Sequence, residues 1–276
     1  MEHEPIEVVL KEAQLLMLEK DYGRALALLE DMVAKIEGSG RELENDKGSE
    51  GFYFENQLEE ILYRELYKPT KDIRMVPGDY AGIYFLYGIV LVEQNRLEEA
   101  ESALRKSSRW NPIMVEPLFE LGEIYKQRQQ YQEYLEITNQ CLERAYRSED
   151  IARCYRNLGY YYIYQGNYDL AIALYCFSTE FSEENEKAES ELLYIAQKID
   201  QDVIPPSLER LQELFAENGI QLGANTLVLQ TAMNLGNQAV DANDYETARY
   251  FYTIFYDLTG HERVKDLIDA LPSTAN

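Results

Sequence analysis

The chain has 276 residues and a formal net charge of −24, with 50 acidic against 26 basic side chains. This balance argues against nucleic acid and anionic membrane surfaces as partners, because binding to phosphates needs a basic surface that releases counterions. The longest apolar run, residues 83–92, is too short to span a bilayer. We expect no nucleic-acid and no membrane partner, and the acidity suits a large, exposed and soluble surface.

The start of the chain and the cysteines indicate the compartment. The sequence MEHEPIEVVLKEAQ contains neither a basic segment nor an apolar segment of the kind that directs export. Cys141, Cys154 and Cys176 are odd in number, form no C-x-x-C and lie among apolar helical positions. We therefore expect core thiols in a reducing environment and a cytoplasmic protein.

Small residues followed by a partner twelve positions later recur along the chain. Such a spacing places the first residue midway along one helix and the second early on the next, so an antiparallel pair can cross closely only without bulk at either site. An aromatic residue or leucine precedes each second site by three positions, at Tyr22, Leu97, Tyr131, Tyr168 and Tyr245. The predicted unit is a repeated helical hairpin, with the pairs Ala13/Ala25, Gly88/Ala100, Gly122/Tyr134, Gly159/Ala171 and Gly236/Ala248.

These hairpins resemble the tetratricopeptide repeat family. The step from Gly88 to Gly122 is 34 residues, which is the length of that repeat. The best copy carries family-like residues at Tyr84, Gly88, Leu91, Ala100, Leu104 and Pro112. Two further copies carry Tyr155, Leu158, Gly159, Tyr162, Ala171 and Tyr175, and Leu235, Gly236, Ala248 and Phe255. The resemblance implies an all-α fold, a right-handed α-α superhelix of the α-solenoid type.

In chain order, we expect one solenoid domain over residues 1–276, with repeats at about 6–37, 78–112, 113–148, 150–185, 187–219 and 227–260. A capping helix follows at 261–271. Tyr134 replaces a small residue, so the helices of its hairpin should splay. In the copy centred on Ala196, Leu208 occupies the small site, and its second helix should restart at Pro205 and Pro206 and end at Asn218-Gly219.

An insert occupies residues 38–77. It begins with the polar run GSGRELENDKGSEG, which predicts a loop, and continues with FYFENQLEEILYRELY, which predicts a helix from Phe52 to Tyr67. Glu59 and Glu60 should lie on its solvated side. We expect the apolar side to cover the first helix of the next hairpin, since that helix otherwise exposes an apolar patch; the alternative is a homodimer contact through Phe85, Leu86, Ile89 and Val92.

Catalysis finds little support in the sequence. His3 and His261 are the only histidines, and no phosphate-binding, dinucleotide-binding or serine-nucleophile motif occurs. Carboxylate pairs such as Glu59/Glu60 are expected by chance in so acidic a chain, and a solvated face is their ordinary explanation. We expect no enzyme, no catalytic residue, no cofactor and no metal.

Recognition remains, and the resemblance implies a concave groove lined by the first helix of each hairpin. Two arginines three residues apart suit a carboxylate, and tyrosines supply contact area at low entropic cost. The alternative is that Arg153 and Arg156 pair with Glu120 and Glu123. The predicted peptide-binding groove consists of Arg153, Arg156, Asn157, Tyr160, Tyr164, Tyr194, Gln197, Glu120, Glu123 and Lys126.

The favoured function is a non-enzymatic scaffold or adaptor that binds a peptide or helix of another protein, as a monomer or weak homodimer. A family variant that grips a C-terminal carboxylate is disfavoured, because its basic sites correspond here to Phe85 and Ile89, Phe119 and Glu123, and Arg156 and Tyr160. One alternative is a peptide-sensing receptor of the bacterial helical-repeat type, although no DNA-binding helix-turn-helix is recognisable. The other is an atypical enzyme subunit.

Overall fold

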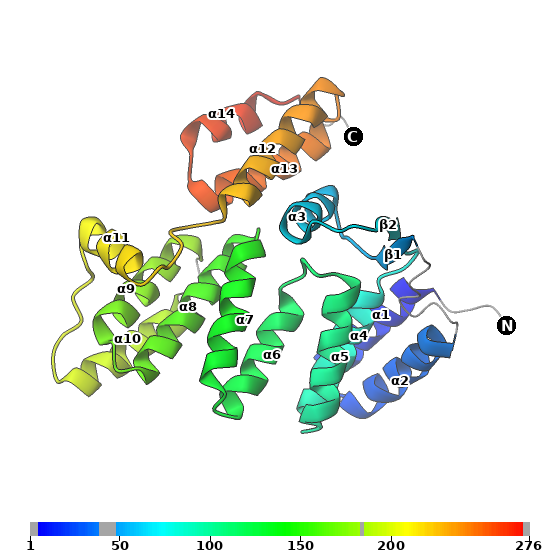
Figure 1. Ribbon diagram of the computed structural model, residues 1–276, viewed down its shortest axis with the longest axis horizontal. Coiled ribbons are helices and arrows are strands. Elements are labelled where there is room, and N and C mark those ends of the chain that lie inside the picture. The colour runs from blue at the N-terminus through cyan, green and yellow to red at the C-terminus, as the bar shows by residue number, and fades with distance from the viewer. Residues whose placement is uncertain (1–4, 39–47, 183–184, 273–276) are drawn as a thin grey trace. The chain divides into compact units, whose positions relative to one another are not determined.

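The structure, a computed structural model, describes residues 5–38, 48–182 and 185–272. Helices make up nearly all of its regular structure (Figure 1). The chain divides into two compact units, residues 1–130 and 131–276. The all-α repeat fold is confirmed, whereas a single domain over the whole chain stays a prediction.

The first unit contains two complete hairpins that pack directly on one another. Both helices of the first hairpin contact the first helix of the second hairpin, and they share one apolar core with it. The helices are α1 (Ile6–Leu18), α2 (Tyr22–Gly38), α4 (Tyr80–Glu93), α5 (Leu97–Trp110) and α6 (Glu116–Gln127).

The second unit continues the helical pattern. Its elements are α7 (Tyr131–Arg144), α8 (Ser148–Tyr164), α9 (Tyr168–Ser178), the 3-10 helix η1 (Thr179–Phe181), α10 (Glu186–Ile199), α11 (Leu208–Glu217), α12 (Thr226–Asp241), α13 (Tyr245–Thr259) and α14 (Glu262–Ala270). The predicted capping helix is confirmed as α14, which packs on α13. The helix expected to restart at the prolines begins just after them, because Ser207 caps it by accepting a hydrogen bond from the Arg210 amide at 3.3 Å.

One turn recurs between the helices of the hairpins. The residue two positions before the start of the second helix has a left-handed backbone, with φ between 56° and 74°. These residues are Lys20, Asn95, Gln129, Gly166 and Asn243. The following amide then donates to the carbonyl five residues back, as Asp21 does to Leu16 and Asp244 to Ala239. The predicted aromatic or leucine comes next and starts the second helix. The repeat is therefore visible in the backbone as well as in the sequence.

The glycines of the small-residue pairs make room for a side chain rather than for a helix backbone. A Cβ on Gly159 would lie 2.7 Å from the Tyr175 ring, and one on Gly236 would lie 2.4 Å from the Tyr252 ring. The contacting residue is sixteen positions after the glycine in each case. Close backbone crossing was the expected reason for these glycines, but the main constraint is the large residue one turn further along the second helix.

The insert is a small β-α-β unit and not only a loop and a helix. Strands β1 (Ser49–Phe52) and β2 (Asp72–Met75) pair in parallel, with Ser49 opposite Asp72 and Phe52 opposite Met75. The helix α3 (Gln57–Tyr67) connects them, and its N-cap Asn56 accepts the Glu59 amide at 3.2 Å. The predicted helix start at Phe52 is therefore wrong. Most of the predicted polar loop, residues 39–47, lies outside the described residues.

The insert does not cover the apolar face of α4, contrary to the prediction. Leu86 belongs to the core that α1, α2 and α4 share, and Phe85 and Ile89 pack against that core. The reason is that the first hairpin stacks directly on the second and supplies this cover, while Val76 near the end of the insert packs against the same core. Its own aromatic rings, which we call the insert cluster, contact one another at centroid distances of 4.5–5.7 Å: Phe52, Phe54, Tyr63 and Tyr67.

Glu59 fastens the insert to the end of α5. Its side chain is 2% exposed, so the solvated position predicted for it is wrong. One carboxylate oxygen accepts from the Glu55 amide at 2.7 Å and from the Asn111 side chain at 2.8 Å. Asn111 in turn accepts from the amide of Ile113 at 3.1 Å. A carboxylate with these donors can stay buried, whereas Glu60 pairs with Arg64 near the surface.

Candidate functional site

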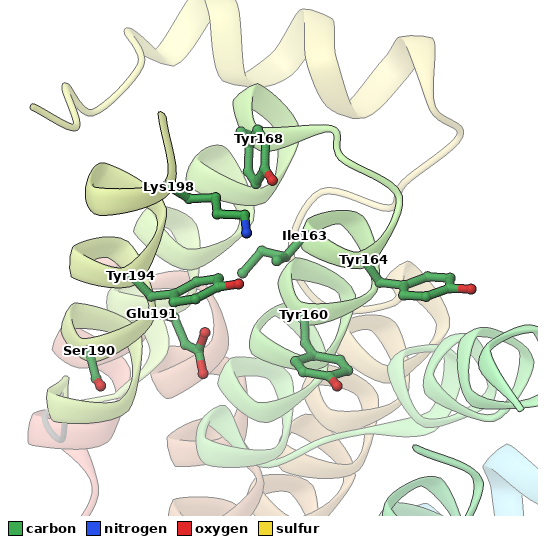
Figure 2. A pocket seen from close by; sticks show the side chains of 8 residues that line it. All are labelled: Tyr160, Ile163, Tyr164, Tyr168, Ser190, Glu191, Tyr194 and Lys198. Carbon is green, nitrogen blue, oxygen red and sulfur yellow. The ribbon is translucent and has the colours of Figure 1, made fainter. Parts of the chain in front are cut away.

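A hollow of about 540 Å³ lies between α8 and α10, the first helices of two neighbouring hairpins in the second unit (Figure 2). Both helices position it through their repeat contacts, since α8 and α10 each pack on α9. We call it the tyrosine hollow. It is lined by Tyr160, Ile163, Tyr164, Tyr168, Ser190, Glu191, Tyr194 and Lys198.

The α8 side of the hollow is held in place by a buried tyrosine. The Tyr155 hydroxyl donates to the carbonyl of Gln221 at 2.8 Å and accepts from the Gly223 amide at 2.7 Å. Its ring packs against Phe177, Phe181 and Phe215. Burial raises the pKa of Tyr155, so the hydroxyl stays neutral. These contacts of Tyr155 hold α8 in place, while Tyr160, Ile163 and Tyr164 of the same helix line the hollow.

Tyrosine rings dominate the open face. Tyr164 is 56% exposed and Tyr194 is 46% exposed, which is unusual for large aromatic side chains on a helix. Tyr164 stacks on Tyr131 of α7 at a centroid distance of 3.6 Å, and Tyr160 meets the buried Tyr134 edge to face at 5.9 Å. The rings on α8 are thus pre-positioned by neighbours while part of their surface faces solvent.

Two opposite charges face the hollow from α10. Figure 2 shows the Tyr194 ring between them, with Lys198 on one side and Glu191 on the other. Within the described part of residues 131–276, neither of these two charged side chains forms an ion pair or a hydrogen bond. A ligand could therefore pair with both without first breaking a protein contact.

Tyr175 belongs to the apolar core against which Ile163 and Tyr168 of the hollow pack, and its ring fills the space beside Gly159. Burial raises the pKa of Tyr175, and the negative charge of Glu191 raises it further. The hydroxyl therefore remains a neutral group at physiological pH.

The predicted arginines lie on the same helix but outside the lining. Arg153, Arg156 and Asn157 are half-buried, one to two turns before Tyr160 on α8. Burial lowers the pKa of Arg156, and the Glu149 carboxylate opposes the shift; the guanidinium stays charged. Arg156 forms no ion pair within the described residues of the second unit, so it is a cation available beside the hollow.

The predicted groove as a whole stays a prediction, and the structure places its residues in both units. Of its residues, Tyr160, Tyr164 and Tyr194 line the hollow, whereas Gln197 is exposed elsewhere on α10. Glu120, Glu123 and Lys126 lie on α6 in the first unit, where Lys126 pairs with Glu123 at 2.5 Å.

Sequence reasoning missed Ile163, Tyr168, Ser190, Glu191 and Lys198. A signal existed for α10, because Glu191, Tyr194 and Lys198 follow the i, i+3, i+7 spacing of one helix face. Tyr168 was assigned only to the turn. In the described residues, His, Cys, Asp and Glu side chains do not gather into a group that could hold a metal ion.

The comparisons with known proteins identify the repeat. Tetratricopeptide repeat models match residues 81–113 and 114–184, which are the second hairpin and the two that follow it. Over residues 81–184 the chain therefore matches tetratricopeptide repeats. Such repeats are typically non-catalytic interaction modules, so the protein is an interaction scaffold in this general sense.

Two solved structures align with the chain along most of its length. PilF from Pseudomonas aeruginosa is 13% identical, with 96% of each chain covered and a TM-score of 0.49. A tetratricopeptide repeat protein from Parabacteroides merdae is 15% identical, with 96% of this chain and 97% of that chain covered and a TM-score of 0.37. No curated protein matches the sequence. The assignment of the repeats in residues 81–184 therefore rests on the two repeat models.

All three cysteines of the protein are free thiols, with Cys141 and Cys154 buried and Cys176 half-buried. Among the described residues, every helix is too short or too polar to cross a bilayer.

Proposed function

We propose that the protein holds an extended peptide segment of a partner protein in the tyrosine hollow. The observation that carries this proposal is one concave site that combines part-exposed tyrosine rings with two opposite charges, Glu191 and Lys198, which form no ion pair within the described part of this unit. Binding energy at protein interfaces concentrates on tyrosine, tryptophan and arginine residues in such positions. Structural aromatics would be buried against one another, and structural charges would be paired.

The segment continues along α8 beyond the hollow in this proposal. Arg156 and Arg153 would accept an acidic side chain or a carboxyl terminus, and Asn157 would hydrogen-bond the peptide backbone. All these residues belong to one helix of the second unit. Their role is secondary, because the hollow supplies most of the contact area.

The test begins with a phage-displayed library of random dodecamers selected on the intact protein. The affinity of the recovered peptide is then measured by fluorescence anisotropy for the parent and for Tyr194→Ala. We expect the substitution to weaken binding by about tenfold or more, because an interface tyrosine in a central position usually contributes that much.

The matched control is Tyr250→Ala, since Tyr250 is 44% exposed on α13 and lies outside the hollow. It should leave the affinity within about twofold. Equal loss in both variants, or undiminished binding to Tyr194→Ala, would contradict the proposal. Failure to select any peptide would contradict it as well.

A further inference from the structure

The hydroxyl groups of the tyrosine hollow indicate what kind of backbone it can accept. Tyr164, Tyr168 and Tyr194 form no hydrogen bond through their hydroxyls within the described part of the second unit. Each hydroxyl is therefore a free donor, and a suitable ligand offers unsatisfied acceptors. A helix uses its internal carbonyls in its own ladder, so it leaves these donors unmatched. An extended backbone exposes its carbonyls.

The tyrosine rings of the hollow also indicate which class of extended peptide it binds. Four of the eight residues that line the hollow are tyrosines. Proline-rich segments in polyproline II conformation dock into aromatic-lined grooves, because the preformed helix loses little entropy and its pyrrolidine rings pack flat on aromatic faces. The same conformation has no internal hydrogen bonds, so its carbonyls face the free hydroxyls.

The charge spacing agrees with this conformation. Glu191 and Lys198 are seven residues apart on α10, which is about 10.5 Å along the helix axis. Side chains three residues apart in polyproline II share a face and are separated by about 9.3 Å. In a β-strand, side chains on one face repeat at about 6.7 Å and 13 Å, which fits the charges less well. Figure 2 shows the Tyr194 ring between the two charges, where the intervening prolines would lie.

We infer that the ligand of the hollow is a proline-rich peptide in polyproline II conformation, with a basic and an acidic side chain three residues apart. The basic side chain pairs with Glu191, the acidic one with Lys198, and the prolines between them pack on Tyr194 and the tyrosines of α8. This inference rests on the proposed function, because it specifies the peptide that the same hollow binds.

The experiment uses three fluorescein-labelled peptides and the intact protein. The first peptide has the core Pro-Lys-Pro-Pro-Glu-Pro, the second reverses its charges to Pro-Glu-Pro-Pro-Lys-Pro, and the third replaces every proline of the better binder by alanine. We expect one charge order to bind about tenfold more tightly than the other. In the weaker peptide, the acidic side chain would face Glu191 and the basic side chain would face Lys198. The alanine peptide should lose about tenfold or more, because it is not pre-organised.

A charge-exchanged protein, Glu191→Lys with Lys198→Glu, sharpens the test. It should prefer the opposite charge order. Its melting temperature should stay close to that of the parent, because neither side chain forms an ion pair within the described residues of the second unit. A preference that stays the same in this variant, or equal binding of the alanine and proline peptides, overturns the inference.

The two proposals fail in different ways. If library peptides require Tyr194 but show no preference for proline or charge order, the hollow binds peptides and the inference about their class is wrong. If no peptide of either kind depends on Tyr194, the proposed function itself is wrong.

Discussion

The insert cluster and the tyrosine hollow are both groups of four aromatic side chains next to a glutamate, yet they differ in how completely their groups are satisfied. In the insert, Phe52, Phe54 and Tyr63 are buried, and Glu59 accepts hydrogen bonds from two donors. In the hollow, the rings are partly exposed and Glu191 has no ion-pair partner in the described residues of its unit. Aromatic content alone therefore does not mark a binding site.

Burial of the rings and pairing of the carboxylate distinguish a cluster that stabilises the fold from a site that binds a ligand. Buried rings and paired carboxylates stabilise the fold, and replacing them leaves cavities or unsatisfied groups. Exposed rings and unpaired charges contribute little to folding, so their retention in a concave site favours a role in binding. This contrast predicts opposite responses to the same substitution in the two regions.

The largest effect is expected for Leu62→Ala in α3. Leu62 is 0% exposed, so its truncation removes buried methyl groups and leaves a cavity, at a cost of about 2–5 kcal/mol in the free energy of unfolding. The matched control is Leu193→Ala on α10, where the side chain is 65% exposed and the change should stay within about 0.5 kcal/mol. Urea unfolding measures both. Similar losses in the two variants would break the comparison.

The glutamates give a smaller effect of the same kind. Glu59→Ala leaves the buried Asn111 side chain and the Glu55 amide without their acceptor, and we expect a loss of about 1–3 kcal/mol. Glu191→Ala removes a half-buried charge that forms no ion pair within the described residues of its unit, and it should change the stability by less than about 0.5 kcal/mol. Denaturant unfolding of the two variants side by side would contradict the account if Glu191→Ala were the more destabilising.

The smallest effect concerns pH. In the first unit, a hydrogen bond from Lys106 lowers the pKa of Glu37 below 4.5, and the Tyr84 hydroxyl donates to the same carboxylate. A lowered carboxyl pKa contributes stability above pH 4.5 that is lost as the pH falls through the native pKa. Since the pair is over one third exposed, the contribution should not exceed about 1 kcal/mol.

Comparison of the parent with Glu37→Gln tests this titration. The stability difference between the two proteins should be largest at neutral pH and should shrink toward acid, because the glutamine cannot ionise. A difference that is constant from pH 7 to below the native pKa would show that the pair has no pH-linked role.

The sequence predicted the repeats because their signals are local. Each hairpin needs a small residue, a left-handed turn and an aromatic or leucine at the start of its second helix, and all three lie within one repeat length. The insert was harder to predict, since Glu59 and Asn111 are distant in sequence and nothing local shows that they meet. The short parallel strands likewise depend on a pairing across α3.

The hollow could be predicted only in part for a similar reason. Tyr160, Tyr164 and Tyr194 follow from groove positions on the first helices, which the repeat pattern defines. Tyr168 and Lys198 enter the site through the packing of α8, α9 and α10, which the pattern of a single helix does not contain. Arg153 and Arg156 lie on α8 outside the lining, and the sequence of α8 alone does not show which of its turns face α10.

The central claim is that the tyrosine hollow binds a peptide while the insert cluster does not. The most direct measurement is an NMR titration of protein labelled with ¹³C in its tyrosine rings, with signals assigned by tyrosine-to-phenylalanine substitution and the library-selected peptide as ligand. We predict shifts at Tyr160, Tyr164, Tyr168 and Tyr194, and unchanged signals at Tyr63 and Tyr67. Shifts confined to Tyr63 and Tyr67, with the four hollow signals unchanged, would contradict the account.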